Sequence, residues 1–234
     1  MISAFITNLG RYNEGYLDGE YLKLPATTEQ VQALLKRIHI DGVQYEEIFI
    51  TDYDIEIPGL YDRLGEYESI DELNYLAALL EELDDGELEK FSAAVEYGEY
   101  TGSVKDLINL AQNLDCYEFY PGVDDDEDLG YYLVDEMGML DIPEHIQPYF
   151  DYEAYGRDIS INESGTFAEN GFIVLGGGFI ELYNGREDIP DEHKIFAYPD
   201  PEKSVLAAMK NYQRMIAEAP AVSHERPRTA TEIS

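Results

Sequence analysis

The chain has few basic residues, a single cysteine and no tryptophan. Its 234 residues include 15 lysines and arginines against 50 aspartates and glutamates, a formal net charge of −35. Because Cys116 is the single cysteine, an internal disulfide and a zinc site built from several thiolates are excluded. A reducing cytoplasm is therefore the expected compartment. No apolar run approaches the ~20 residues needed to span a bilayer, and no basic-then-apolar start indicates a signal peptide.

Patterns typical of catalysis or nucleotide binding are missing as well. The histidines, His39, His145, His193 and His224, are scattered and form no H-E-x-x-H pattern. The chain contains no G-x-S-x-G, no G-x-G-x-x-G and no Walker sequence. With so many acids present, no single pair of carboxylates indicates acid–base catalysis. The sequence predicts that the protein is not an enzyme and uses no cofactor.

An acidic run suggests a calcium loop but does not complete one. Asp124, Asp126 and Asp128 fall at positions 1, 3 and 5 of an EF-hand loop. Position 6 requires glycine and position 12 a bidentate glutamate, whereas the chain has Leu129 and Asp135 there. We therefore predict no physiological metal site, and at most weak adventitious cation binding.

The negative charge is concentrated in the middle of the chain. Residues 61–165 contain 29 acidic and 4 basic residues, a net of −25, whereas residues 1–60 have a net of −6 and residues 166–234 a net of −4. A solvated helix face usually interleaves lysine with glutamate, and this segment has almost no such pairs. Its self-repulsion costs stability, so we expect the acids to bind, repel or imitate something.

The amount of charge matches a short DNA duplex. B-DNA carries one charge per ~1.7 Å of axis, so 35 negative charges correspond to roughly 17 base pairs. A helix rises ~1.5 Å per residue, so acids every two to four residues lie ~3–6 Å apart, close to the phosphate spacing of one strand. A basic groove built for a duplex would be attracted to such a surface.

Hydrophobic periodicity predicts an α+β fold with five segments. They are a small α/β domain at residues 1–60, an acidic helical domain at 61–114, an α+β domain at 115–185, a C-terminal extension at 186–219 and a disordered tail at 220–234. In the first segment, alternating apolar residues predict strands at 2–6, 20–24 and 45–55 around a turn-rich stretch at 10–19. Thr27 and Gln30 predict a capping box for the intervening helix.

The second segment predicts helices only. Ser69 and Glu72 indicate a capping box, Gly86 separates a second helix, and Ser103 caps a third. The apolar stripes of these helices should face inward, leaving the acids outside. Together with the acidic run that follows, the predicted acidic surface comprises Asp71, Glu72, Glu81, Glu82, Asp84, Asp85, Glu87, Glu89, Glu96, Glu99, Asp106, Asp124, Asp125, Asp126, Glu127 and Asp128.

The third and fourth segments mix strands and helices. Strands are predicted at residues 116–120 and 158–161, with a helix between them that Gly138 closes. A further hairpin is predicted from two strands, 171–175 and 179–183, joined by three glycines. An amphipathic helix is predicted at residues 202–218.

A long, irregular set of residues in the third segment resembles the antirestriction region of the ArdA family. The matching residues are Tyr132-Leu133-Val134, Gly138-Met139-Leu140-Asp141, Pro143, Tyr149-Phe150-Asp151-Tyr152-Glu153-Ala154 and Gly156-Arg157-Asp158. The resemblance extends upstream through Tyr12, Asn13, Gly15 and Gly19, and covers roughly residues 1–170 but not the last sixty or so.

The resemblance implies an elongated, modular, acidic homodimer, carried by a mobile genetic element, that imitates double-stranded DNA. Such a protein would occupy the DNA-binding groove of type I restriction-modification enzymes, whose methyltransferase core is the expected partner, and would bind neither nucleic acid nor membrane. An alternative from another class is an acidic chaperone that sequesters a basic nucleic-acid-binding protein. The two differ in whether inhibition is specific to restriction enzymes.

Large apolar side chains stand beside the most acidic run. They are Met139, Leu140, Ile142, Tyr149 and Phe150, with Tyr152 and Tyr155 next to them. An exposed apolar patch would be unusual on a polyanion, and two such monomers repel each other. We therefore predict that the cluster forms the dimer interface, with the last two tyrosines at its rim. The alternative is that the first five residues fill a domain's own core.

Overall fold

The computed structural model describes residues 2–199 and residue 209. Its helices and small antiparallel sheets make an α+β fold, as the sequence predicts. No helix in this part of the chain is long and apolar enough to cross a membrane. The predicted tail at 220–234 and nearly all of the predicted helix at 202–218 fall outside the described residues.

The first sheet places β1 (Ile2–Asn8) between β2 (Gly19–Leu24) and β3 (Ile48–Ile55), all antiparallel. The inward residues of β1 are buried, as their alternation predicts. β3 begins later than the predicted start at residue 45. The stretch predicted as turns contains a short helix, α1 (Leu9–Asn13), because the Asn8 side chain accepts a hydrogen bond from the Arg11 amide at 2.9 Å and caps it.

α2 (Thr28–Arg37) begins at the predicted capping box. The Thr27 hydroxyl accepts a hydrogen bond from the Gln30 amide, and the Gln30 side chain accepts one from the Thr27 amide at 2.8 Å. Its apolar stripe is buried in the core that it shares with the first sheet. The sequence predicts this helix correctly because its start signal and its hydrophobic period agree.

Three helices follow, α3 (Ile70–Glu81), α4 (Asp85–Tyr97) and α5 (Val104–Gln112), and Ser69 and Ser103 cap the first and the third as predicted. Two details differ. Ser69 accepts a hydrogen bond from the Glu72 amide, but the Glu72 carboxylate binds elsewhere, so the predicted capping box is only half formed. Gly86 lies inside α4, because Asp84 and Glu87, on either side of it, form a complete capping box and the helix begins at Asp85.

The second sheet corrects the predicted hairpin. β6 (Gly171–Leu175) pairs on one side with β4 (Tyr117–Pro121) and on the other with β5 (Thr166–Ala168). The hairpin is therefore β5–β6, and residues 179–183 form no strand. The three glycines, residues 176–178, follow β6 and lead the chain away from the sheet, and they do not connect two strands.

The far end of the chain's middle segment is a helical pair. α6 (Asp126–Tyr131) runs on into one π-helical turn, η3 (Tyr132–Glu136), and packs against α7 (Tyr152–Asn162). α7 occupies the stretch where a strand was predicted at 158–161; that prediction is wrong, because Asp151 caps a helix with a 3.0 Å bond to the Ala154 amide. A short 3₁₀ turn, η4 (Gln147–Tyr149), lies in the connection.

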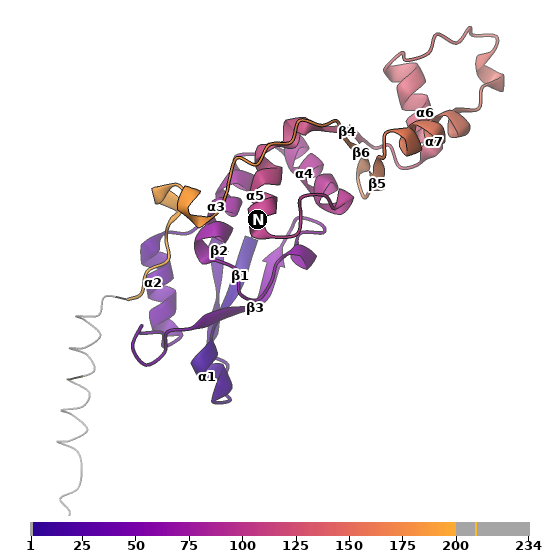
Figure 1. The fold of residues 1–234 in the computed structure, drawn as a ribbon. Helices are drawn as coiled ribbons and strands as arrows, with labels where there is room; N and C mark the ends of the chain where they lie inside the picture. The colour runs from indigo at the N-terminus through magenta and orange to yellow at the C-terminus, as the bar shows by residue number, and fades with distance from the viewer. Residues whose placement is uncertain (1, 200–208, 210–234) are drawn as a thin grey trace, which may run out of the picture.

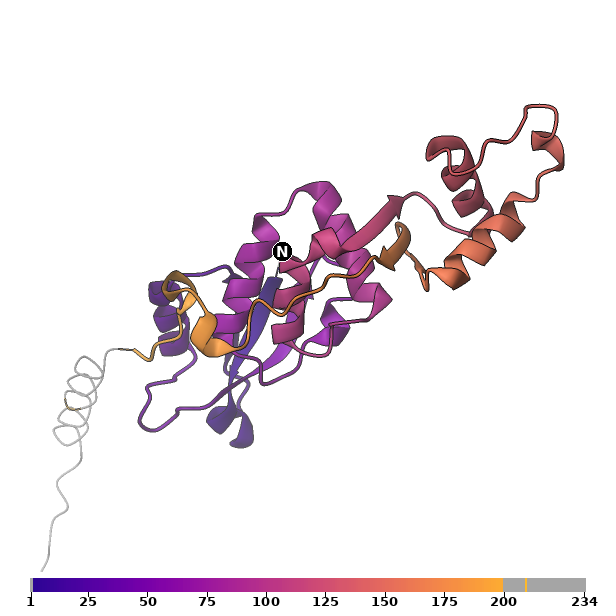
Figure 2. The ribbon, with the colours of Figure 1, turned by 45° about the horizontal axis from the view of Figure 1, so that its top comes forward.

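After the second sheet, residues 176–199 run back over the helices as an extended segment, here called the strap (Figures 1 and 2). Asn109 of α5 accepts hydrogen bonds from the amides of Leu182 and Tyr183 at 2.7 and 2.9 Å and donates one to the Tyr183 carbonyl at 2.8 Å. Asn113 binds the strap at Ile180 in the same way. Side-chain amides thus take the place of the partner strand that the sequence predicted.

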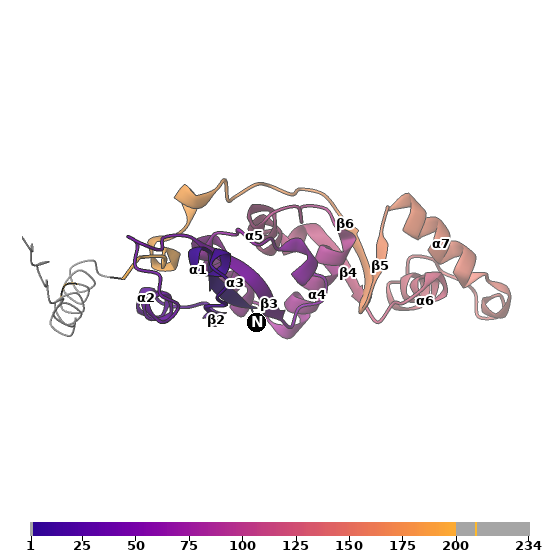
Figure 3. The ribbon, with the colours of Figure 1, turned by 90° about the horizontal axis from the view of Figure 1, so that it is seen from below.

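The elements follow one another along the molecule. The first sheet and α2 lie at one end, α3, α4 and α5 come next, and the second sheet connects them to α6 and α7 at the other end, while the strap follows one side back towards α2 (Figures 1 and 3). The main hydrophobic core extends from Ile2 through the helices to Ile173 and Ile195. A smaller cluster, including Leu129, Leu133 and Phe172, joins α6 to the second sheet. The remaining short turns are η1 (Tyr61–Arg63), η2 (Leu114–Cys116), η5 (Arg186–Asp188) and η6 (Asp191–His193).

Candidate functional site

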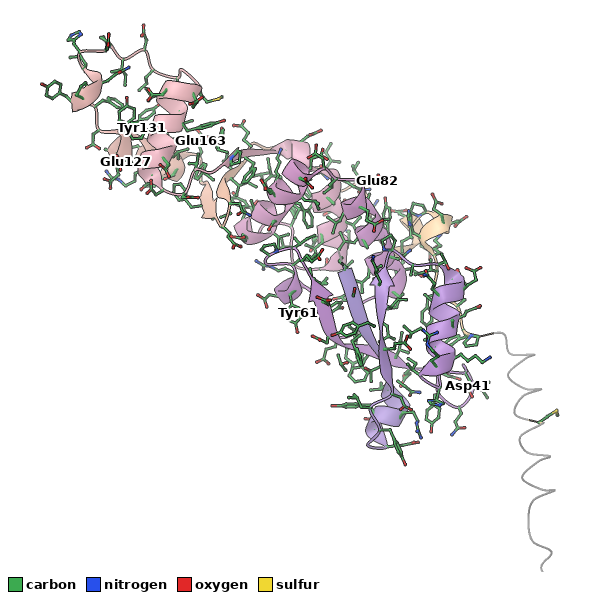
Figure 4. All side chains as sticks on the ribbon, turned by 180° about the vertical axis from the view of Figure 1, so that it is seen from behind. Asp41, Tyr61, Glu82, Glu127, Tyr131 and Glu163 are labelled. Carbon is green, nitrogen blue, oxygen red and sulfur yellow. The ribbon has the colours of Figure 1, made fainter. Side chains whose placement is uncertain are left out.

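The corner between α3 and α4 carries a dense group of exposed carboxylates, here called the corner acids. They are Glu81, Glu82, Asp84, Asp85, Glu87 and Glu89, and all six are exposed. Figure 4 shows Glu82 on the outer surface, just after α3. Asp84 and Glu87 also cap α4, where negative charge at a helix N-terminus is favourable. The remaining four accept no hydrogen bond and form no ion pair that the described part of the chain shows, so their side chains are available to another molecule.

The few bases nearby do not neutralise the corner acids. Arg63 donates a hydrogen bond to the Val95 carbonyl at 3.2 Å, and Lys105 pairs with Glu181 of the strap at 3.1 Å. Within the described residues, none of the corner acids forms an ion pair. Unpaired like charges so close together repel, and the fold tolerates this cost.

Two predicted surface acids face the strap instead of solvent. Glu72 is only 9% exposed. Its carboxylate accepts a hydrogen bond from the Tyr183 hydroxyl at 2.9 Å and forms a salt bridge with the Arg186 guanidinium at 3.0 Å. Half-buried Asp71 accepts the amides of Ile195 and Phe196 at 2.8 and 2.7 Å. The prediction that these two acids lie outside is wrong, because the strap covers this part of α3.

Three more predicted surface acids are half-buried and hydrogen-bonded within the chain. Glu96 accepts the Glu169 amide at 3.0 Å, Asp106 accepts the Ser103 hydroxyl at 2.8 Å, and Asp126 accepts the Ser160 hydroxyl at 3.2 Å. These contacts fix local structure and leave less of each carboxylate for a partner. Glu99, by contrast, is exposed.

A second group of acids surrounds the start of α6. Asp124, Asp125, Glu127 and Asp128 are exposed, and the Asp125 side chain caps the helix by accepting the Asp128 amide at 2.9 Å. Glu127 and Tyr131 are seen at this end of the molecule in Figure 4, with Glu163 nearby. Within residues 2–199, no cluster of three or more possible ligands could hold a metal ion.

The first sheet also carries exposed acids, which lie outside the acidic surface predicted from the sequence. Asp52 on β3 is exposed and accepts hydrogen bonds from the hydroxyls of Tyr21 at 2.6 Å and Tyr61 at 3.4 Å. The bond from Tyr21 lowers the pKa of Asp52. The alternation of Asp52 and Asp54 along β3 is the sequence signal for these acids, although residues 1–60 have a net charge of only −6.

The predicted interface residues lie in and beside the loop between η3 and α7. Tyr149 is 85% exposed, Met139 is 55% exposed and Leu140 is 38% exposed. Ile142 and Phe150 are half-buried. The five residues therefore do not all fill a core of their own, and that alternative is wrong.

The two tyrosines expected at the rim have different surroundings. Tyr152 is buried and stacks on Tyr131, with ring centroids 4.0 Å apart. Tyr155 is half-buried and contacts the Phe150 ring at 5.8 Å between centroids. Arg157 is exposed and faces Glu153, one turn earlier on α7, at 3.8 Å. Tyr152 thus belongs to the packing of α6 on α7, where aromatic pairs add stability.

These features define an acidic α+β protein with many carboxylates and few cations to balance them. A family model described as antirestriction protein (ArdA) matches residues 4–174. The chain therefore belongs to the ArdA family, whose members are inhibitors that act on restriction-modification enzymes. A search of curated proteins finds no match to the chain.

Proposed function

We propose that the protein imitates double-stranded DNA and occupies the DNA-binding groove of a type I restriction-modification enzyme. The observation that carries this proposal is the set of exposed corner acids, which have no basic partner among the described residues. Phosphate contacts supply much of the affinity of a protein for a duplex, so a groove that binds phosphates should also bind these carboxylates. Recognition would be of charge and shape and not of base sequence.

The positions of the acidic regions along the molecule support imitation of an extended length of duplex. Acids on the first sheet, at the α3–α4 corner and at the start of α6 belong to successive regions of the molecule (Figure 4). We propose that this elongated, modular arrangement follows an extended basic groove, and that the segments predicted from the sequence act as its modules. Charge spread in this way steers a partner and aligns it without a single decisive contact.

We further propose that two chains associate through the loop that carries Met139, Leu140 and Tyr149. Exposed apolar side chains beside a polyanion are best explained by a contact that removes them from water. Leu140→Asp or Tyr149→Asp should give a folded monomer by sedimentation with an unchanged circular dichroism spectrum. The same change at exposed Ile161 on α7 is the control. An intact dimer in the loop variants would place the interface elsewhere.

The main test uses the methyltransferase core of a type I enzyme. The protein should bind it, duplex DNA should compete, and affinity should fall steeply as salt rises from about 50 to 200 mM. An affinity that does not change with salt, or a ternary complex that retains DNA, would contradict the mimicry. Equal inhibition of unrelated basic DNA-binding proteins would favour a general sequestering role instead.

A further inference from the structure

A pocket of about 360 Å³ opens beside the corner acids, between the first sheet and α3–α4. Its walls are mainly apolar: Ile2 and Leu24 come from β1 and β2, Leu80 from α3 and Leu88 from α4. This volume is near the lower end of the ~300–1,000 Å³ range of ligand pockets. The pocket is therefore large enough to admit a large side chain.

The mouth of this pocket is acidic. Three exposed acids line it: Glu56 after β3, Glu81 at the end of α3 and Glu89 on α4. Glu81 and Glu89 have no ion-pair partner within the described residues. An apolar wall beneath these two unpaired carboxylates fits a group that has an apolar stem and a cationic head, and it disfavours an anion or a purely apolar group.

We propose that this pocket receives an arginine side chain of the restriction-modification enzyme, with its alkyl stem against the apolar wall and its guanidinium at Glu81 and Glu89. The proposal rests on the proposed function. Arginine fits better than lysine because its guanidinium is weakly hydrated and recognises carboxylates through a planar fork. Proteins also insert arginine into narrow minor grooves of DNA, where negative potential is enhanced. The acid-rimmed pocket would offer the enzyme an equivalent of such a groove.

The first variant fills the pocket without changing charge. Ala77 lines the pocket and is buried on α3, so Ala77→Leu would place a larger side chain in it. Ala78→Leu, at the next position and outside the lining, is the matched control. With the methyltransferase core as the partner, Ala77→Leu should weaken binding at least about tenfold, while the slope of log affinity against log salt stays unchanged. The control should stay within about twofold.

The second comparison changes charge by equal amounts at two places. Glu81→Gln with Glu89→Gln alters the mouth, whereas Glu82→Gln with Asp85→Asn alters neighbouring corner acids that do not line the pocket. The mouth pair should weaken binding at least about tenfold more than the control pair. If circular dichroism shows that Ala77→Leu does not fold, this comparison still tests whether the mouth of the pocket contributes to binding.

The outcomes distinguish a failure of the proposed function from a failure of the pocket proposal. If the unchanged protein does not bind the methyltransferase core, the proposed function fails. If it binds, and the two charge pairs cost the same, the pocket proposal is wrong while the mimicry stands. A loss on filling the pocket without an excess loss at the mouth would mean an apolar anchor, and would overturn the assignment to arginine.

Discussion

Glu72 shows how a predicted surface residue can become a structural one. Its carboxylate is buried between α3 and the strap, where Tyr183 and Arg186 both donate to it. Removing one partner of a buried charged group leaves that group without compensation, which costs more than the bond itself contributes. The strap should therefore depend on this contact for its attachment to the helices.

Tyr183→Phe tests that dependence. The variant keeps the buried ring but removes the hydroxyl that donates to Glu72. We expect the free energy of unfolding to fall by about 1–3 kcal/mol, because one carboxylate oxygen loses its donor. Thermal and denaturant unfolding measure the change. Tyr61→Phe, which removes an exposed hydroxyl 3.4 Å from Asp52, is the control and should cost much less.

Alkaline pH should also act through Tyr183. Burial and the hydrogen bond to Glu72 raise the pKa of Tyr183 above its usual value. A group with a raised folded-state pKa contributes fully below its unfolded pKa of about 10, and its contribution is lost as pH rises further. Stability should therefore fall above about pH 10, and Tyr183→Phe should make that fall shallower. An equally steep fall in the variant would contradict this role.

The inward placement of Asp71 and Glu72 could not be predicted from α3 alone. The stripe of α3 was predicted correctly from its own period, yet the face that carries Asp71 and Glu72 is covered by residues more than a hundred positions later. The corner acids, Glu99 and four of the acids at the start of α6 kept the exposure that local reasoning gives them. The local sequence determines which apolar stripe of a helix faces the core, and long-range packing determines which of its polar residues stay exposed to solvent.

At the scale of elements, two glycines set the distance between α6 and α7. A side chain at Gly130 would lie 2.0 Å from the Tyr152 carbonyl oxygen, and one at Gly156 would lie 1.9 Å from the Asp126 carbonyl oxygen. Both obstacles are backbone atoms that cannot move aside without separating the helices. The pair of glycines therefore permits a contact that no other residue allows.

Gly130→Ala or Gly156→Ala should separate the helical pair. Each change should destabilise the protein by about 1–3 kcal/mol, the usual cost of overpacking, in spite of alanine's better helix propensity. Hydrogen exchange should show the loss in α6 and α7 first. Gly86→Ala, on α4, is the matched control because its new side chain would meet only the Asp84 carboxylate at 3.4 Å; it should be neutral or stabilising.

The same contact explains the failed strand prediction at residues 158–161. Four alternating residues resemble a short strand, but the stretch is too short to exclude a helix. The cap at Asp151 and the close packing of Gly156 against α6 favour a helix over a strand. The prediction at 179–183 failed for a related reason, since the backbone of this stretch is extended but its hydrogen-bond partners are the side chains of Asn109 and Asn113 and not a strand.

At the scale of the whole molecule, unpaired charge should oppose folding. The net charge of −35 includes corner acids that repel one another and that form no ion pair with any residue the structure describes. Salt shortens the range of this repulsion, with a screening length of about 10 Å at 0.1 M and about 3 Å at 1 M. The melting temperature should therefore rise with sodium chloride over this range. A fall would mean that the ion pairs, such as Arg186 with Glu72, outweigh the repulsion.

Neutralising the corner acids should change stability and inhibition in opposite directions. The variant replaces Glu81, Glu82 and Glu89 with glutamine and Asp85 with asparagine. It leaves Asp84 and Glu87 in place because they cap α4. Fewer unpaired charges mean less repulsion in the folded state, so at low salt the variant should melt higher than the unchanged protein. Its affinity for the methyltransferase core should fall far more than after Glu82→Gln alone, since a single exposed charge contributes only ~0.2–1 kcal/mol.

This opposition follows from a surface that is kept for binding at a cost in stability. A purely solubilising surface would predict the higher melting temperature without the loss of affinity. A localised site would instead predict that one of the single substitutions removes inhibition by itself. Melting curves at low salt and binding isotherms for the block variant, the single variants and the unchanged protein separate the three cases, and a block variant that binds as tightly as the unchanged protein would contradict the proposed role of the corner acids.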